Sequence, residues 1–252
     1  MNVLHVGETI PWVIAHRGAS REFPENTAAA FDAALGFPID GIELDLQLSR
    51  DDVPVVWHDR TLTRAGASRR RVGELRLEDL RALDLGSRFH RRFRGERILT
   101  LDEVLDRYGG RSRLLLEIKA REEPRAAERH ARLVESTLAA VARRALEPSV
   151  LLLCFDPKAL DLARGIAPRI PTVLNLRSLP AGAAWRRLDP LFALSVDARV
   201  LTGRFVREAH DRGKPVLTFT CNTPRSVALA LRAGVDAIMS DRPGWLLGIL
   251  TP

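Results

Sequence analysis

The sequence predicts a single α/β domain, a (β/α)8 TIM barrel with a hairpin and a small insertion after its second barrel strand. Its 252 residues, 46% of them hydrophobic, can bury a sizeable core and match one large barrel better than two small domains. Eight short apolar runs alternate with helical patterns along the chain, as in a parallel barrel. The gap after the second run is much longer than the others. We therefore assign residues 1–252 to a single barrel domain, with residues 46–112 as a hairpin plus insertion at its carboxyl-terminal mouth.

Each predicted strand is a short apolar run, and the predicted helices fill gaps between runs. The parallel strands are residues 12–16, 41–45, 113–119, 150–155, 170–176, 191–196, 215–219 and 235–239, and the return strand of the hairpin is residues 54–58. The helices are residues 27–35, 125–144, 157–164, 203–212 and 224–233. Asn26 is predicted to cap the first helix, which is a sufficient structural explanation for the run Pro24-Glu25-Asn26-Thr27.

The second strand and its hairpin carry three side chains capable of chemistry. Glu43 and Asp45 project to the same face, because strand side chains alternate with a period of two. Two carboxylates on one face repel each other unless they share a cation or a proton. If Asp51 and Asp52 form a two-residue loop, Asp45 lies opposite His58. The pattern thus predicts a carboxylate pair beside an imidazole.

Other polar residues fall at predicted strand ends, where the chemistry of a (β/α)8 barrel is located. This set is His16, Arg17, Glu43, Asp45, Glu117 and Lys119. A lone histidine with apolar neighbours is usually a core residue, but the company of Arg17, Glu43 and Asp45 favours a functional interpretation of His16. Glu117 can be interpreted as a functional residue of this set or as the partner of an ion pair with Lys119 on the same strand face.

The net positive charge is concentrated in the insertion. Between Arg60 and Arg97 there are twelve arginines and five acidic residues, a net +7 that equals the formal net charge of the whole chain. Such a segment can attract phosphate groups, nucleic acid or an anionic membrane surface. A solvated loop decorated with arginine is the other interpretation that the composition allows.

The cysteines and the first residues of the chain indicate in which cellular compartment the protein is located. Cys154 and Cys221 lie in separate apolar runs without CxxC spacing, which favours neither a disulfide framework nor a thiolate metal site. Residues 1–18 lack the pattern of a secretory leader, and no apolar run approaches membrane-spanning length. We expect a soluble, cytoplasmic protein.

Eight short motifs carry a resemblance to a known family. In chain order they are His16-Arg17-Gly18, Pro24-Glu25-Asn26-Thr27, Glu43-Leu44-Asp45, His58-Asp59, Leu101-Asp102-Glu103, Glu117-Ile118-Lys119, Thr220-Cys221-Asn222 and Asp241-Arg242-Pro243. Any one of them would be weak, but the ordered set covers nearly the whole chain. The sequence resembles the glycerophosphodiester phosphodiesterase family, whose fold is a barrel with an insertion after the second strand.

The resemblance implies a metal-dependent phosphoric diester hydrolase that releases glycerol 3-phosphate and an alcohol from glycerophosphodiesters. The implied metal ligands are Glu43, Asp45 and Glu117, the general base and general acid are His16 and His58, and the phosphate-holding residues are Arg17 and Lys119. An oxygen-rich ligand set suits one divalent cation, Mg²⁺ or Ca²⁺. The family is thought to use the neighbouring glycerol hydroxyl as internal nucleophile, and two imidazoles can make the two proton transfers.

Two departures from the family pattern concern the substrate and the surface. Phe219 stands where relatives commonly carry a tryptophan, so the apolar wall of the alcohol pocket is expected to differ. The insertion is short and arginine-rich. We expect a small glycerophosphodiester as substrate, a contact between an anionic membrane surface and the segment from Arg60 to Arg97, and no nucleic acid.

Three interpretations remain open. Lysophospholipase D or sphingomyelinase D-like activity on long-chain lysolipids is the alternative to the leading one, and it predicts an apolar groove near Phe219. An inactive barrel that binds through its basic segment is disfavoured, because no implied ligand or histidine is missing. Asp241 either closes the last barrel loop by hydrogen bonding or acts in the site.

Overall fold

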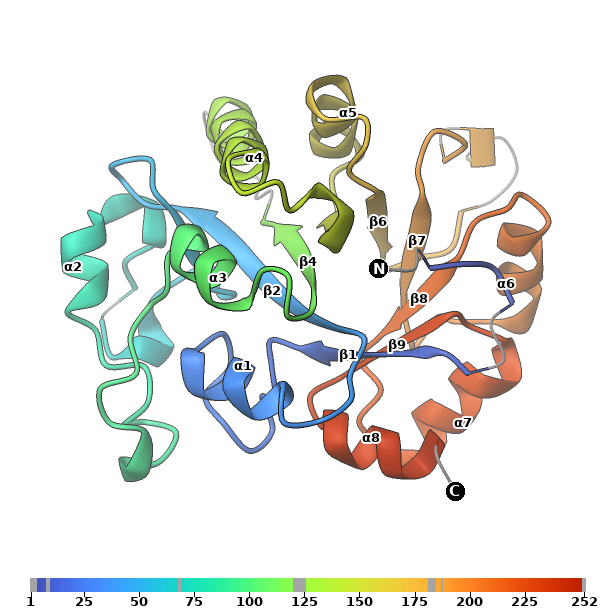
Figure 1. Ribbon diagram of the computed structural model, residues 1–252, viewed down its shortest axis with the longest axis horizontal. Coiled ribbons are helices and arrows are strands. Elements are labelled where there is room, and N and C mark those ends of the chain that lie inside the picture. The colour runs from blue at the N-terminus through green and yellow to red at the C-terminus, as the bar shows by residue number, and fades with distance from the viewer. Residues whose placement is uncertain are drawn as a thin grey trace.

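Eight parallel strands close into a barrel in the computed structural model, which describes residues 4–7, 10–67, 69–119, 126–180, 185–186 and 188–250 (Figure 1). The barrel strands are β1 (Trp12–His16), β2 (Gly41–Leu48), β4 (Arg113–Ile118), β5 (Val150–Cys154), β6 (Thr172–Leu176), β7 (Ala193–Asp197), β8 (Val216–Phe219) and β9 (Ala237–Ser240). β1 pairs in parallel with both β9 and β2, which closes the sheet. A further strand, β3 (Pro54–Val56), pairs antiparallel with the end of β2. The predicted fold class is confirmed.

The helices lie in the connections between the strands. Five correspond to predicted ones: α1 (Ala28–Ala34), α4 (Ala126–Ala142), α5 (Pro157–Ile166), α6 (Gly203–His210) and α7 (Pro224–Ala233). Arg125, where the second predicted helix begins, is outside the described residues. The sequence analysis missed α2 (Leu77–Arg81), α3 (Leu101–Tyr108), α8 (Pro243–Leu250) and the 3-10 turns η1 (Thr63–Ala65), η2 (Val72–Glu74), η3 (Arg91–Phe93) and η4 (Glu147–Ser149). A Thr100 and Glu103 capping box marks the start of α3, a signal present in the sequence.

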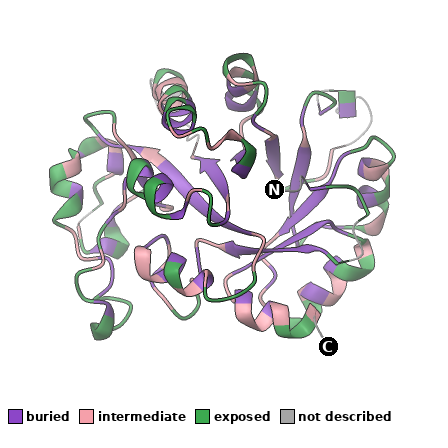
Figure 2. Ribbon diagram, in the orientation of Figure 1, coloured by how far each residue is buried: buried purple, intermediate pink, exposed green. Residues whose placement is uncertain are grey.

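Two apolar layers follow from the alternation of strand side chains. Outward residues such as Leu44 and Leu46, both 0% exposed, pack beneath the helices. Inward residues such as Trp12, Ile14 and Met239 fill the barrel interior as a separate cluster, and Figure 2 shows the strands as almost entirely buried. Each such large apolar side chain contributes about 1.5 to 3 kcal/mol through burial. The polar residues at the carboxyl ends of the strands therefore lie above a packed floor.

The insertion after β3 has an apolar cluster of its own. Trp57, Leu62, Val72, Leu80 and Ile98 are all buried in it. In Figure 1 these residues belong to the cyan and green segment beside α1 and α3. The insertion thus has a core of its own, which Val55 on β3 joins to the barrel. No helix among the residues that the structure describes is long and apolar enough to cross a bilayer.

The predicted hairpin register is wrong by one residue. The Trp57 N–H donates to the Asp45 carbonyl over 2.9 Å, so Trp57, not His58, lies opposite Asp45. The loop has three residues, 50–52, and Asp52 at its end has a φ of 59°, as is common in three-residue hairpin loops. β3 also ends two residues before His58, so the backbone beyond the strand, and not cross-strand pairing, sets the direction of that imidazole.

The predicted cap of α1 is also wrong. Thr27 is the N-cap, and its hydroxyl oxygen accepts from the Ala30 N–H over 3.4 Å. Asn26 has a φ of 59° and donates from its side-chain amide to Asp45 Oδ2 over 2.8 Å. Asn26 therefore supports a carboxylate of the barrel mouth and not the helix.

Candidate active site

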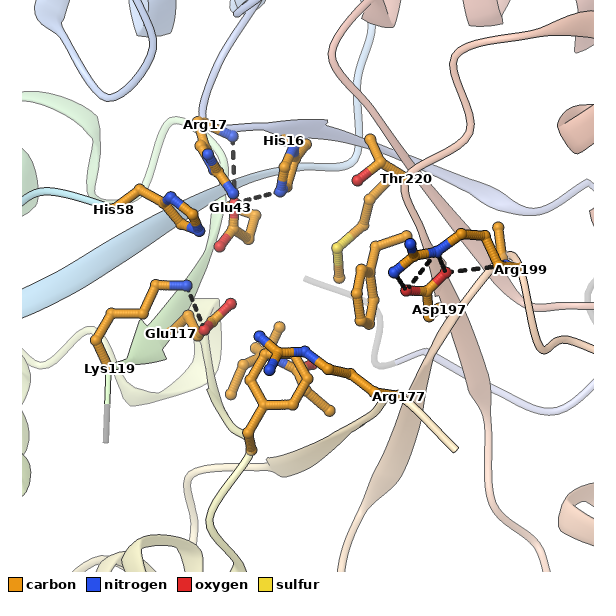
Figure 3. Close-up of a pocket in the computed structure, with 16 residues that line it drawn as sticks. His16, Arg17, Glu43, His58, Glu117, Lys119, Arg177, Asp197, Arg199 and Thr220 are labelled. Atoms are coloured by element: carbon orange, nitrogen blue, oxygen red, sulfur yellow. Dashed lines mark hydrogen bonds and ion pairs between the residues drawn. The ribbon is translucent and has the colours of Figure 1, made fainter. Parts of the chain in front are cut away.

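A cavity of about 370 Å³ opens at the carboxyl-terminal mouth of the barrel, and most of the predicted site residues line it (Figure 3). These are His16, Arg17, Glu43, His58, Glu117, Lys119 and Phe219. Asp45 is not part of the wall, because it is fully buried beneath it, at 0% exposure. The fold thus brings together residues as far apart in the sequence as His16 and Phe219.

Three buried carboxylates form the floor of the site. Glu43, Asp45 and Glu117 each offer an oxygen within 4.8 Å of the others. They come from adjacent strands, since Asp45 on β2 pairs with Glu117 on β4. Glu43 Oε1 is buried without a hydrogen-bond partner. A cluster of buried carboxylate oxygens with unfilled acceptor capacity fits a hard divalent cation such as Mg²⁺ or Ca²⁺.

Two cations neutralise part of this cluster. Lys119 Nζ lies 2.7 Å from Asp45 Oδ1 and 2.5 Å from Glu117 Oε1, and Arg17 Nε lies 3.1 Å from Asp45 Oδ2. The ion pair of Glu117 with Lys119 that the sequence suggested is therefore present, and it coexists with the cluster. Both cations remain at the cavity wall.

The carboxylates consequently differ in proton affinity. Burial raises the pKa of Asp45, but Lys119 and Arg17 outweigh it and hold the pKa well below its usual range. Burial, followed by the charges of Asp45 and Glu117, raises the pKa of Glu43 well above its usual range. Burial lowers the pKa of Lys119, and the neighbouring carboxylates more than reverse this, so Lys119 stays charged. Glu43 is therefore a weaker acid than Asp45.

Arg17 is fixed by an unusual turn at the end of β1. Its φ is 60°, and Gly18 follows with a φ of 82°. A Cβ on Gly18 would lie 2.6 Å from the backbone of Ala30, so only glycine allows this approach to α1. The Arg17 N–H donates to the Glu43 carbonyl over 2.9 Å, and its guanidinium contacts Glu25 over 3.0 Å. A left-handed arginine held by several contacts is typical of a functional turn.

His16 is oriented by Asp241, whose role the sequence left open. His16 Nδ1 lies 2.6 Å from Asp241 Oδ1, while Nε2 lies 3.9 Å from Glu43 Oε2. Asn222 donates to the other Asp241 oxygen over 2.6 Å and accepts from the Asp241 N–H over 2.9 Å. Burial raises the pKa of Asp241, but His16 outweighs it and lowers the pKa overall. An ionised Asp241 requires the proton on Nδ1, so Nε2 of a neutral ring can accept one.

His58 has a similar carboxylate partner. Its Nδ1 lies 2.9 Å from Asp59 Oδ1, and the second oxygen of Asp59 accepts from Arg64. In Figure 3, His58 and His16 lie on either side of Glu43. The two imidazoles therefore flank the carboxylate cluster, each with its Nδ1 held by an aspartate.

The wall across the cavity contains residues that the sequence analysis missed, apart from Phe219. Asn175, Arg177 and Asp197 stand at or just after the ends of β6 and β7. Phe155, just after β5, packs edge-to-face with Phe219 at a centroid distance of 6.0 Å. Their positions at strand ends were the available signal.

Comparisons with known proteins extend over the whole barrel. The model of the glycerophosphoryl diester phosphodiesterase family matches residues 16–245. A glycerophosphodiester phosphodiesterase of Caldanaerobacter subterraneus subsp. tengcongensis is 31% identical, over 94% of this chain and 97% of its own. The crystal structure of a putative glycerophosphoryl diester phosphodiesterase from Silicibacter pomeroyi has a TM-score of 0.86 at 32% identity and covers 98% of this chain and 95% of that one. An Oleispira antarctica phosphodiesterase, solved with the product sn-glycerol-3-phosphate, also has a TM-score of 0.86, at 28% identity over 96% of this chain and 98% of that one.

Proposed function

The chain belongs to the glycerophosphoryl diester phosphodiesterase family of phosphoric diester hydrolases, and on this premise we propose that it converts small glycerophosphodiesters into glycerol 3-phosphate and an alcohol. The observation that carries the proposal is the pair of aspartate-backed imidazoles, His16 and His58, on either side of the buried carboxylates. Phosphodiester cleavage needs one group to take a proton and another to give one, and this arrangement offers both.

The phosphate is bound by residues at the carboxyl ends of β1, β2 and β4. Arg17 and Lys119 supply positive charge at the cavity wall. Glu43, Asp45 and Glu117 would hold one divalent cation, which when bound polarises a phosphoryl oxygen and offsets its charge. Arg17, Lys119 and the cation held by the carboxylates would together keep the diester against the two imidazoles.

Proton transfer is assigned to the two histidines. His16 Nε2 takes the proton of the glycerol hydroxyl next to the phosphoester as that oxygen attacks phosphorus. His58 gives a proton to the departing alcohol oxygen, leaving a cyclic phosphate. Water then opens the ring with the roles exchanged, and glycerol 3-phosphate leaves. Loss of either imidazole is expected to lower the rate by about 10²- to 10⁴-fold.

The wall near Phe219 is mixed in polarity and is not the apolar groove that the lysophospholipase D alternative predicts. Asn175 and Arg177 present polar groups there beside Phe155 and Phe219. Covering such groups with an alkyl chain leaves hydrogen-bonding atoms unpaired, which costs about 1 to 3 kcal/mol for each. This disfavours the lysophospholipase D alternative.

The tip of the insertion supports contact with an anionic membrane surface. Phe89 is 45% exposed there, next to η3. Arg88, Arg91, Arg94 and Arg97 have no ion-pair partner within the part of the chain that the structure describes. Each arginine near an anionic surface is worth about 1 kcal/mol. Salt-sensitive sedimentation with phosphatidylglycerol vesicles but not phosphatidylcholine vesicles is expected, and equal sedimentation with both would contradict the contact.

The test of the proposed acid and base uses a leaving group that needs no proton. Glycerophospho-p-nitrophenol releases p-nitrophenolate before ring opening needs His58 as a base, so in the first turnover His58→Ala should recover most of the wild-type rate on it, whereas His16→Ala should stay slow on every substrate. His210→Ala, which removes a histidine paired with Asp236 away from the cavity, is the matched control and should keep its rate. If neither histidine variant recovered its rate on glycerophospho-p-nitrophenol, or if both recovered it equally, the assignment of acid and base would be refuted.

A further inference from the structure

The end of β6 lies across the cavity from His16. In the closed order of the barrel, β6 is four strands from β1 in either direction, so the two strands are opposite. Arg177 directly follows β6. The proposed phosphate-binding residues all belong to the β1, β2 and β4 side, so one arm of a bound diester extends toward Arg177.

Arg177 has no hydrogen-bonded or ion-paired acid within the described residues, although it is near enough to Asp197 to help Arg199 lower the pKa of that carboxyl. Its guanidinium carbon lies 4.3 Å from the centroid of the Phe155 ring, and the described residues give it no hydrogen bond or ion pair. Arg199, also on this wall, differs, because Asp197 accepts hydrogen bonds from its Nε and Nη2 over 2.9 and 2.5 Å. Figure 3 shows the Arg177 side chain directed into the cavity. Stacking on Phe155 holds the guanidinium while its N–H donors stay available, a geometry that suits a carboxylate.

The same wall is poorly suited to a cationic alcohol. Phe155 and Phe219 form the edge-to-face pair from which a cage for quaternary ammonium could be built. Arg177 already covers the face of Phe155, however, and would repel a second cation. Asp197 does not compensate, since both of its oxygens accept from Arg199. Two guanidinium groups and one carboxylate leave this wall with a net positive charge.

We infer that Arg177 forms an anion-binding subsite for the alcohol arm, and that the enzyme therefore prefers glycerophosphodiesters whose alcohol carries a carboxylate or another anionic group. The inference rests on the proposed function and adds a substrate class to it. Arg177 is a specificity-determining residue in this account, and it takes no part in the proton transfers.

Glycerophosphoserine and glycerophosphoethanolamine test this directly, because their alcohols differ by one carboxylate. Both release glycerol 3-phosphate, so one assay gives kcat/KM for each, and the ratio is independent of the fraction of enzyme that is folded. The wild type should favour glycerophosphoserine by about tenfold, equivalent to about 1.4 kcal/mol. Arg177→Gln should bring the ratio close to one, and Arg177→Glu should invert it.

Arg169→Gln is the matched control. Arg169 is exposed and precedes β6, so the variant loses the same charge at the opposite end of the same strand. Its ratio should equal that of the wild type. An Arg177→Gln ratio equal to that of the wild type, or a wild type that favours glycerophosphoethanolamine, would overturn the subsite while leaving the proposed function intact. If the protein hydrolysed neither substrate, both the subsite and the proposed function would be overturned.

Discussion

Replacing Glu43 by glutamine should stabilise the cation-free protein and at the same time remove its response to a divalent cation. Glu43 is 1% exposed, and its Oε1 has no hydrogen-bond partner. Its Oε2 accepts from the Arg17 N–H over 3.2 Å, a contact that the glutamine oxygen can keep. The glutamine NH₂ would then face Asp45 and Glu117 and could donate to them. In the wild type these two carboxylates instead repel the carboxylate of Glu43.

The expected size follows from the cost of the unpaired buried oxygen. Such a group costs about 1 to 3 kcal/mol, and more when charged. In a protein of this length each kcal/mol shifts Tm by about 2 to 4 °C, so the cation-free Glu43→Gln variant should melt roughly 2 to 10 °C above the wild type at pH 8.

The effect should depend on pH, because burial and its acidic neighbours raise the pKa of Glu43. A raised pKa means that the folded protein binds this proton more tightly than the unfolded chain does. The stability from Glu43 is then fully present below its ordinary value of 4.5 and is lost as pH rises through the raised value. The advantage of Glu43→Gln should therefore be larger at pH 8 than at pH 5.

Thermal melts in EDTA, and then with excess Mg²⁺ or Ca²⁺, provide the assay. A cation at a hundred times its Kd adds about 2.7 kcal/mol to the wild type, and the variant should gain little, having lost a ligand. Glu135→Gln, an exposed change on α4, should melt like the wild type under each condition. A cation-free Glu43→Gln protein that melts below the wild type, or one that gains as much from the cation, would refute the reasoning.

Two further changes test the parts that hold the catalytic residues in place. Asp241→Asn weakens a charge-assisted contact with His16, and a loss of about 1.5 to 3 kcal/mol should lower kcat/KM by about 10- to 100-fold and shift its pH profile. Asp236→Asn, which alters a histidine–aspartate pair away from the cavity, should change Tm and leave the pH profile unaltered; equal profiles for both variants would contradict a positioning role for Asp241. Gly18→Ala places a Cβ 2.6 Å from the Ala30 backbone at a φ of 82°, so Tm should fall by several degrees and activity with it. A fully active Gly18→Ala protein with an unchanged melt would show that this turn tolerates a side chain.

The fold was predictable because the strands carry their own signals. Apolar runs such as 12–16 and 150–155 are buried on both faces, as parallel barrel strands are, and their order leaves few topologies. The hairpin register was not predictable from composition, because the polar run from Ser49 to Val53 is compatible with a two-residue and with a three-residue loop, and only the structure shows the three-residue loop with Asp52 at a φ of 59°. The short helix α2 was also not predictable, because its five residues are too few to show a helical period.

Predictability of the site depended on where its residues stand. Glu43, Asp45 and Glu117 lie on adjacent strands, so alternation and strand order were enough to bring them together. Arg177 and the contact of Asp241 with His16 depend on side-chain directions after strands have ended, and no sequence period describes these. The second group became visible only from the three-dimensional arrangement.

The most direct test of the central claim is the release of glycerol 3-phosphate from a glycerophosphodiester by the purified protein, with Mg²⁺ or Ca²⁺ and with EDTA. Glycerophosphoserine and glycerophosphocholine together cover an anionic and a cationic alcohol. We expect release that requires the divalent cation and falls by at least about 10²-fold in His16→Ala. Release that persists in EDTA, or that His16→Ala retains, would contradict the account, as would no release from either substrate.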